Sequence, residues 1–252
     1  MPSLVGSEMC IRDSFNSSKF INQTIKSVLN QTYKKWKLII VDDGSDSKTK
    51  LILNKFKDNK KIKIFFLKKN MGAGYCRNLA IKKSNSYYLA FIDSDDMWLK
   101  NKIKKQINFM QKNKYDFSYT NYFSFKDGSK KLKKVITPSK TNFADFIKNT
   151  SIGTSTMMIK RSITKNIKFT NTEICEDYFY KCLLLKKINY AFCLQSLLTK
   201  YRIRNNSLQS NRLKNIFWIW KINQKFNKLN FFQNLISIFF ISINSLLKYG
   251  LK

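Results

Sequence analysis

A short apolar run ends in two acids and a turn at Leu38-Ile39-Ile40-Val41-Asp42-Asp43-Gly44-Ser45. Four consecutive large apolar residues indicate a strand that is buried on both faces, and an aspartate followed by a glycine is a common turn sequence. A second run of this kind, from Tyr87 to Ile92, ends at Asp93-Ser94-Asp95-Asp96. Both acidic clusters therefore come directly after a predicted buried strand.

Strands and helices alternate around these two runs. Residues 62–67 form a further predicted strand, and apolar residues recur at helical spacing in 21–29, 72–83 and 103–110. This alternation is typical of βαβ units, so we expect an α/β fold with a mostly parallel central sheet flanked by helices. In such sheets ligands bind beyond the carboxyl ends of the strands, which is where both acidic clusters lie.

The second half of the chain is less regular. Residues 117–125 and 154–159 are predicted strands, and Glu176 to Lys187 is a predicted helix. The segment Tyr201-Arg202-Ile203-Arg204 ends the folded body, which we expect to be a single compact unit.

The character of the chain changes from Ile216 onward. Aromatic and aliphatic residues are interleaved there with Lys, Asn and Ser, most densely from Phe231 to Leu247. This stretch is marginal in length and polarity for spanning a bilayer. It is better suited to an amphipathic helix that lies in a membrane interface, or to one that packs on the body or on a second subunit.

The composition narrows the possible chemistry. The chain has 252 residues and no His, which excludes His-based triads and leaves acid–base work to carboxylates, Tyr, Lys or Cys. The 5 Cys form no close-spaced pairs, so a disulfide framework is disfavoured and a reducing compartment is favoured. The net charge of +33 attracts phosphate-rich partners, but the abundant Lys, Asn, Ile and Phe are also typical of an AT-rich genome. Charge alone therefore does not identify the partner.

The acidic clusters have both a functional and an ordinary interpretation. Asp93 and Asp95, two positions apart after a buried strand, are suited to hold a Mg²⁺ or Mn²⁺ ion. The same acids are common at the first turn of a helix. Asp42 and Asp43 are placed to hydrogen-bond a base or a ribose, or to form a plain turn.

Two further segments are candidates for the same site. A Gly-bearing loop that includes Asn70 and Gly72 leads into a helix carrying Arg77, and such a loop is able to approach phosphate closely. The alternative is an ordinary helix start. Glu176 and Asp177 begin another helix, where the helix dipole alone favours acids.

Together, the order and spacing of these elements resemble the family 2 glycosyltransferases, a large inverting family with the GT-A fold. The resemblance runs from Phe15-Asn16 to about Ser207, which is most of the chain. Each matching stretch is weak alone, but the set is specific. The stretches are Ser27-Val28-Leu29-Asn30-Gln31-Thr32-Tyr33, Ile39 to Ser45, Asn70-Met71-Gly72 through Ala80, Phe91-Ile92-Asp93-Ser94-Asp95-Asp96, and Glu176-Asp177.

The resemblance implies which residues bind the nucleotide-diphosphate sugar. Asp43, with Asp42 beside it, corresponds to the acid that contacts the uracil or ribose of the donor. The loop at Asn70 and Gly72 belongs to the same donor site, and Arg77 lies where the family has a residue near the diphosphate.

The resemblance also implies a metal and a base. Asp93 and Asp95 correspond to the metal-binding DxD motif, with Asp95 as the direct ligand of Mn²⁺ or Mg²⁺ and Asp93 also near the donor. Asp177 corresponds to the general base that takes the proton of the acceptor hydroxyl. Glu176 is its rival for that role, because the two acids are adjacent.

Two departures from the family pattern bear on the site. Residues 1–14 do not read as a signal peptide or as a strand, and Val5 to Ser14 looks like translated sequencing adapter rather than gene. We therefore expect the first strand of the fold to be missing. Many relatives have a His where Arg204 stands here, which puts a third metal contact in doubt and makes Arg202 and Arg204 candidate diphosphate cations.

The expected protein is an inverting glycosyltransferase of surface polysaccharide biosynthesis. It would use a nucleotide-diphosphate sugar, expected to be UDP-linked, and a saccharide or lipid-linked acceptor. We expect it at the cytoplasmic face of an anionic membrane. The alternatives are a basic nucleic-acid-binding protein, for which no motif is found, and an inactive glycosyltransferase-like module.

The expected parts are a GT-A domain over 15–210, with a nucleotide-binding half (15–115) and an acceptor half (116–210), and a tail over 211–252.

Overall fold

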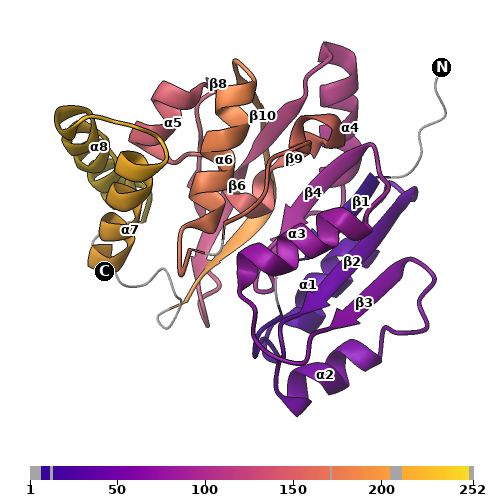
Figure 1. The fold of residues 1–252 in the computed structure, drawn as a ribbon. Coiled ribbons are helices and arrows are strands. Elements are labelled where there is room, and N and C mark those ends of the chain that lie inside the picture. Colours follow the sequence, from indigo (N-terminus) through magenta and orange to yellow (C-terminus); the bar gives the residue numbers. More distant parts are fainter. Residues whose placement is uncertain (1–6, 12–13, 171, 205–211, 250–252) are drawn as a thin grey trace.

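The computed structural model describes residues 7–11, 14–170, 172–204 and 212–249. Its centre is a ten-stranded sheet (Figure 1). Eight of the strands follow the order β3-β2-β1-β4-β9-β6-β10-β5, and the other two, β7 and β8, pair with β6 and β10. The strands are β1 Ser7–Ile11, β2 Trp36–Asp42, β3 Ile62–Phe66, β4 Tyr88–Ile92, β5 Met97–Trp98, β6 Phe117–Lys126, β7 Lys133–Val135, β8 Lys140–Thr141, β9 Met158–Lys160 and β10 Ala191–Ile203.

Eight α-helices and two short 3₁₀ helices are formed by the described residues. The helices are α1 Ile21–Leu29, α2 Ser47–Asn54, α3 Ala73–Lys83, α4 Lys102–Asn113, α5 Phe143–Asn149, α6 Glu176–Lys187, α7 Arg212–Lys225 and α8 Phe231–Tyr249, with the 3₁₀ helices η1 Thr154–Thr156 and η2 Arg161–Thr164. The alternating first half and the helix from Glu176 to Lys187 agree with the sequence prediction.

The sheet has a parallel half and a mixed half. Strands β3, β2, β1 and β4 are all parallel, since a helix connects each of them to the next along the chain. Strand β9 is antiparallel to both β4 and β6, whereas β6 and β10 are parallel to each other. The expected α/β fold is confirmed, and its parallel part is the half that carries both acidic clusters.

The first strand is present, which corrects the expectation that it is missing. Strand β1 pairs with β2 on one side and with β4 on the other, and Ile11 lies opposite both Ile40 and Ile92. A gap at this place would leave backbone N–H and C=O groups of both neighbours unpaired. Because these hydrogen bonds involve only the main chain, the strand forms although its sequence lacks the pattern of a buried strand.

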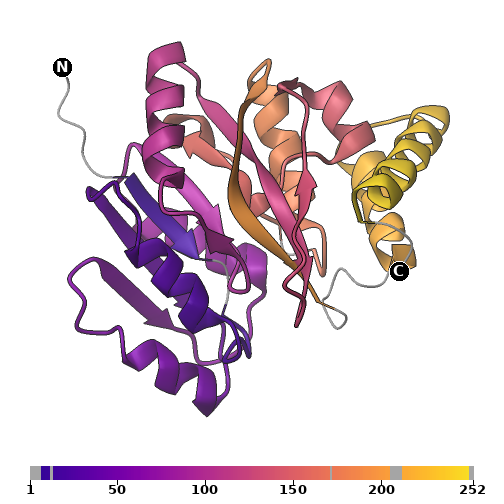
Figure 2. The same ribbon diagram turned by 180° about the vertical axis from the view of Figure 1, so that it is seen from behind.

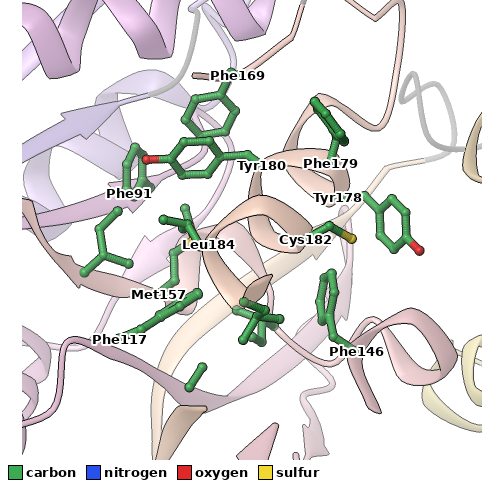
Figure 3. Close-up of a cluster of buried hydrophobic side chains, with 14 of the residues drawn as sticks. Phe91, Phe117, Phe146, Met157, Phe169, Tyr178, Phe179, Tyr180, Cys182 and Leu184 are labelled. Atoms are coloured by element: carbon green, nitrogen blue, oxygen red, sulfur yellow. The ribbon is translucent and has the colours of Figure 1, made fainter. Parts of the chain in front are cut away.

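Helices cover both faces of the sheet and create two apolar cores. Figure 1 shows α3 and α6 over one face, and Figure 2 shows α1 and α4 over the other. Strand β2 supplies both cores by alternation: Ile39 and Val41 join the α3 and α6 side, while Leu38 and Ile40 join the α1 and α4 side. Figure 3 shows part of the first of these cores, in which aromatic side chains such as Phe146 and Phe169 lie beside those of α6.

The segment from Thr154 to Ile159 was predicted as one strand, and this prediction is only partly correct. Residues 154–156 form the 3₁₀ helix η1, and only Met158–Lys160 is a strand. The hydroxyl side chains of η1 make tertiary hydrogen bonds that a strand would not allow, as described below.

The C-terminal helices pack on the body of the protein. Ile219, Ile222 and Ile241 are buried in the core around α6, and the Tyr178 hydroxyl donates to Asn223 Oδ1 at 2.7 Å. The Ser237 hydroxyl donates to the backbone carbonyl of Ile147 at 2.5 Å. One side of the tail is therefore part of the domain.

Four of the cysteines, Cys76, Cys175, Cys182 and Cys193, are buried free thiols. This agrees with the expectation that the protein has no disulfide framework among these residues.

Candidate functional site

The two acidic clusters lie at the same edge of the sheet. Ile40 in β2 and Ile92 in β4 are level with one another across β1, and both strands are parallel. Asp42 and Ser94, each two residues further on, therefore stand at the same height, about two strand spacings or roughly 10 Å apart. The Ser17 hydroxyl lies 2.9 Å from that of Ser94, so the segment after β1 bridges the two clusters.

Asp42 organises the loop that follows β1. Its side chain is fully buried, and it accepts hydrogen bonds from the Ser14 hydroxyl at 2.5 Å and from the Ser45 backbone N–H at 3.2 Å. The Ser45 hydroxyl in turn donates to the carbonyl of Ser14. The carboxylate thus connects the loops after β1 and β2, and it faces the protein rather than solvent.

Asp43 organises the Gly-bearing loop. Its two carboxylate oxygens accept from the backbone N–H groups of Met71 at 2.6 Å and of Gly72 at 2.9 Å. Gly44 has φ +72°, and a Cβ on it would lie 2.9 Å from the backbone of Lys69. The two loops therefore touch, and Asn70 is exposed at their rim. Asp43 therefore holds the loop that carries Asn70 and Gly72 in place.

Arg77 is at the centre of a buried charge network. Its guanidinium donates to Glu176 Oε1 at 2.7 Å and to Asp93 Oδ1 at 3.2 Å, and it lies over the ring of Phe169 at 4.9 Å. The side chain has no exposed surface. Arg77 was predicted to reach the donor diphosphate, and its complete burial argues against that contact. It instead connects the end of β4 to the start of α6.

The adjacent acids at the start of α6 have different surroundings. Glu176 is buried against Arg77, whereas the Asp177 side chain is 15% exposed. Asp177 Oδ2 accepts from the Thr154 hydroxyl and from Lys181 Nζ, each at 2.8 Å. Asp177 Oδ1 accepts no hydrogen bond from the residues that the structure describes. The structure therefore distinguishes a structural acid from one with an available oxygen.

The charge state of Asp177 is set by opposing effects. Burial raises the pKa of its carboxyl, but the nearby cations Lys181 and Arg77 and the two hydrogen bonds to Oδ2 outweigh it and hold the pKa well below its ordinary value of 3.8. Asp177 is consequently ionised at neutral pH.

The part played by η1 could not be predicted from a motif in the sequence. The Ser155 hydroxyl accepts from the backbone N–H of Asp93 at 2.9 Å, while Thr154 donates to Asp177. The Ser155 carbonyl also accepts from Trp98 Nε1 at 2.7 Å. This short helix therefore fixes the Asp93 end of β4 relative to the base candidate. Only the run of small hydroxyl residues from Thr154 to Thr156 could have drawn attention to it.

The end of β10 is attached to the second acidic cluster. Asp96 is buried and accepts from the backbone N–H of Arg202 at 2.8 Å. Burial and the neighbouring charges of Asp95 and Asp93 raise the pKa of the Asp96 carboxyl well above its ordinary value. The Arg202 guanidinium donates to Asp127 at 3.0 Å and to the carbonyl of Asp95 at 3.0 Å. Arg202 therefore serves the structure of this turn.

Arg204 has a different position. Its Nε lies 2.9 Å from Asp95 Oδ2, although the N–H is not aligned for a hydrogen bond. Its side chain is 34% exposed, against 7% for Arg202. Of the two cations predicted for the diphosphate, Arg204 is the accessible one.

A divalent cation held by Asp93 and Asp95 does not match this arrangement. Asp93 is paired with Arg77 and Asp95 with Arg204, so both carboxylates already face positive charge. The expectation of Mn²⁺ or Mg²⁺ at this position is therefore disfavoured by the chemistry of the donor set.

Comparison with known sequences identifies related proteins. Residues 11–169 match the sequence profile of glycosyl transferase family 2. The chain is 36% identical over 223 residues to TuaG of Bacillus subtilis (strain 168), a protein assigned to teichuronic acid biosynthesis as a glycosyltransferase, with 88% of each chain covered. It is 33% identical over 213 residues to WfgD of Escherichia coli, covering 84% of this chain and 83% of that protein. WfgD is described as a UDP-Glc:alpha-D-GlcNAc-diphosphoundecaprenol beta-1,3-glucosyltransferase.

Comparison with solved structures supports the same fold. The structure of S. aureus TarS 1-349 in complex with UDP-GlcNAc superposes with a TM-score of 0.74. The match covers 98% of this chain and 76% of that one, at 19% identity.

Proposed function

The chain belongs to glycosyl transferase family 2 and is a glycosyltransferase, and we propose that it moves a sugar from a UDP-linked donor to a lipid-linked saccharide with inversion at the anomeric carbon. The proposal for donor and acceptor rests on WfgD, which is described as acting on UDP-Glc and alpha-D-GlcNAc-diphosphoundecaprenol. The work of TuaG in teichuronic acid biosynthesis supports a role in making surface polysaccharide.

The observation that carries the mechanism is the available oxygen of Asp177. Oδ2 is held by Thr154 and Lys181, which orients the carboxylate and leaves Oδ1 for an acceptor hydroxyl. As the hydroxyl oxygen attacks the anomeric carbon, Oδ1 takes its proton. The bond from the anomeric carbon to the diphosphate oxygen breaks, and its electron pair leaves with UDP.

The remaining residues of the site act on the donor. We expect Asn70 and Gly72 to border the nucleoside end, with Asp42 and Asp43 holding the loops that form it. Asp93 is held between Arg77 and η1, which supports a role at the sugar or ribose of the donor. The divalent cation expected from the family resemblance is not part of this proposal, because its two aspartates face arginines.

The donor and stereochemistry are tested by one assay on the full chain. UDP-glucose, UDP-galactose, UDP-GlcNAc and GDP-mannose are each incubated with a GlcNAc-diphospho-lipid, and release of the nucleoside diphosphate is measured. We expect release from a UDP-sugar to exceed that from GDP-mannose by about tenfold or more, and to require the acceptor. The anomeric configuration of the product, read by NMR, should be inverted. A retained configuration, or no release from any UDP-sugar, would contradict the proposal.

We further propose that α8 attaches the enzyme to an anionic membrane. Among the described residues it is the one helix with the length and hydropathy to cross a membrane. Its polar side chains Asn234 and Ser237 are buried against the body, which favours a helix that lies on the surface rather than spans it. Its outer side is apolar and largely exposed, and includes Phe231, Phe232, Leu235, Ile236, Phe239, Phe240 and Leu247.

The charge around this apolar side favours anionic lipid. Residues 212–252 include no Asp or Glu and several Lys, such as Lys221, Lys225 and Lys228. An apolar helix face with basic flanks binds the interface by burial of its side chains and by attraction to lipid headgroups. A lipid-linked acceptor and a reducing cytoplasmic compartment agree with attachment at the inner face.

Substitution of two exposed phenylalanines should weaken membrane binding. Phe232 is 74% exposed and Phe239 is 60% exposed, so Phe232→Ser with Phe239→Ser removes apolar contacts with lipid without opening the core. We expect the fraction that floats with phosphatidylglycerol vesicles to fall by about tenfold or more, given roughly 1.5–3 kcal/mol for each buried Phe. The matched control is Leu51→Ser with Ile136→Ser, which are 65% and 63% exposed elsewhere.

Point variants suit this test better than removal of the tail. Ile219, Ile222 and Ile241 belong to the domain core, so a truncated chain would lose packing as well as the apolar surface. Equal flotation of the wild type and both double variants, or equal binding to phosphatidylcholine vesicles, would overturn the attachment of α8 to anionic lipid.

A further inference from the structure

Three arginines converge on the acidic clusters, and two of them are committed to the fold. Arg77 is fully buried between Glu176 and Asp93. Arg202 is 7% exposed and donates to Asp127, to the carbonyl of Asp95 and to Gln23. Neither guanidinium is able to reach a ligand without breaking a buried network.

The third arginine, Arg204, is ion-paired with Asp95 and partly exposed. Its buried Nε lies 2.9 Å from Asp95 Oδ2 without an aligned hydrogen bond. Its guanidinium carbon lies 5.6 Å from the centre of the Phe20 ring. The terminal amino groups make no hydrogen bond or ion pair with any other described residue, and a third of the side chain is exposed. Arg204 therefore has donors available for a ligand.

The backbone that carries Arg204 is fixed even though the side chain is accessible. Arg204 comes directly after β10. Arg202, near the end of that strand, donates its backbone N–H to the side chain of Asp96. Strand β5, which follows the same acidic cluster, pairs with β10 through Met97 and Lys200. These contacts fix the backbone of β10 up to Arg202, and the ion pair between Nε and Asp95 Oδ2 keeps the Arg204 guanidinium beside the same cluster.

We propose that Arg204 supplies the positive charge at the donor diphosphate, in place of a divalent cation. A guanidinium is always protonated and presents several N–H donors in a plane, which suits two phosphate oxygens. The ion pair places Nε beside the Asp95 carboxylate and leaves the terminal amino groups for the diphosphate. A divalent ion at Asp95 would meet this guanidinium on the same carboxylate and be repelled by it. Arg204 then stabilises the charge that develops on the leaving UDP.

This inference rests on the proposed donor class, and its test separates the two. Affinities of UDP, dTDP, GDP, CDP and uridine for the full chain are measured by calorimetry, each with EDTA and with Mn²⁺. For the wild type we expect UDP to bind in EDTA, with less than about a threefold gain from Mn²⁺. Arg204→Ala should lose about 10- to 100-fold in UDP affinity in EDTA while uridine affinity is unchanged, because a hydrogen bond to a charged group is lost.

The same variants report on the metal directly. Removal of the guanidinium leaves Asp95 able to take a cation, so Arg204→Ala should bind UDP more tightly when Mn²⁺ is added. Arg161→Ala is the control for general loss of charge, and it should leave all affinities unchanged. Arg204→Lys should recover part of the UDP affinity, since it keeps the charge but not the planar donors.

Each outcome has a distinct meaning. If the wild type binds UDP only with Mn²⁺, or if Arg204→Ala and wild type bind UDP equally in EDTA, the role of Arg204 is overturned and the proposed donor stands. If another nucleoside diphosphate binds and shows the expected dependence on Arg204, the role of Arg204 stands and the UDP donor is overturned. If none of the four diphosphates binds under either condition, both proposals fail.

Discussion

Asp177→Asn is expected to reduce kcat by about two to four orders of magnitude, the usual contribution of a general base. The amide keeps an oxygen that can accept from Thr154 and Lys181, but it has no second oxygen to take a proton. Donor affinity should be nearly unchanged, because Asp177 acts on the acceptor. The measurement is kcat and KM at saturating donor, with UDP affinity from calorimetry.

Glu176→Gln is the matched control for Asp177→Asn. Glu176 is buried and accepts a hydrogen bond from the Arg77 guanidinium at 2.7 Å. Loss of its charge should therefore lower the stability of the protein more than the turnover of the folded enzyme. Both variants should therefore be assayed well below their unfolding temperatures. Near-normal turnover in Asp177→Asn, together with a large loss in Glu176→Gln, would assign the base to Glu176. Normal turnover in both would leave the proposed mechanism without a base.

Arg77→Met is expected to lower the free energy of unfolding by about 3–5 kcal/mol, which is the usual effect of removing one partner from a buried ion network. The change leaves Glu176 and Asp93 without their shared cation in a site where Arg77 has no exposed surface. It also removes the contact with the Phe169 ring. Urea denaturation followed by far-UV circular dichroism gives the difference in free energy of unfolding between the variant and the wild type, provided that both have the same m-value.

A double variant identifies the cause of that loss. If the loss comes from the unpaired charge, Arg77→Met with Glu176→Gln should be more stable than the sum of the single effects predicts, by about 0.5–3 kcal/mol. Additive effects would indicate that packing against Phe169, not the ion pair, accounts for the destabilisation. Full stability of Arg77→Met would show that the network has no structural role.

Much of the fold could be predicted from local patterns. Buried parallel strands are continuous apolar runs, so β2 and β4 are recognisable in the sequence together with the acids that follow them. Ligands bind at the carboxyl ends of parallel strands, and this rule predicted that the clusters at Asp42 and Asp93 lie at one edge of the sheet. The helix beginning at Glu176 was predicted with its correct bounds, because its apolar spacing and acidic first turn are also local features.

The tertiary structure decided which of the candidate residues are buried in pairs and which stay accessible. Arg77 and Glu176 are 99 positions apart, and only their contact shows that both are structural, leaving Asp177 as the acid with an available oxygen. Strand β1 forms because two neighbours need backbone partners, whatever its own side chains. Local sequence determines the spacing of apolar residues in helices and strands, the positions of turns, and where acids follow a strand. Burial and pairing depend on residues distant in the chain. The accessibility of Arg204 could therefore be seen only in the tertiary structure, and its proposed contact with the diphosphate depends on that accessibility.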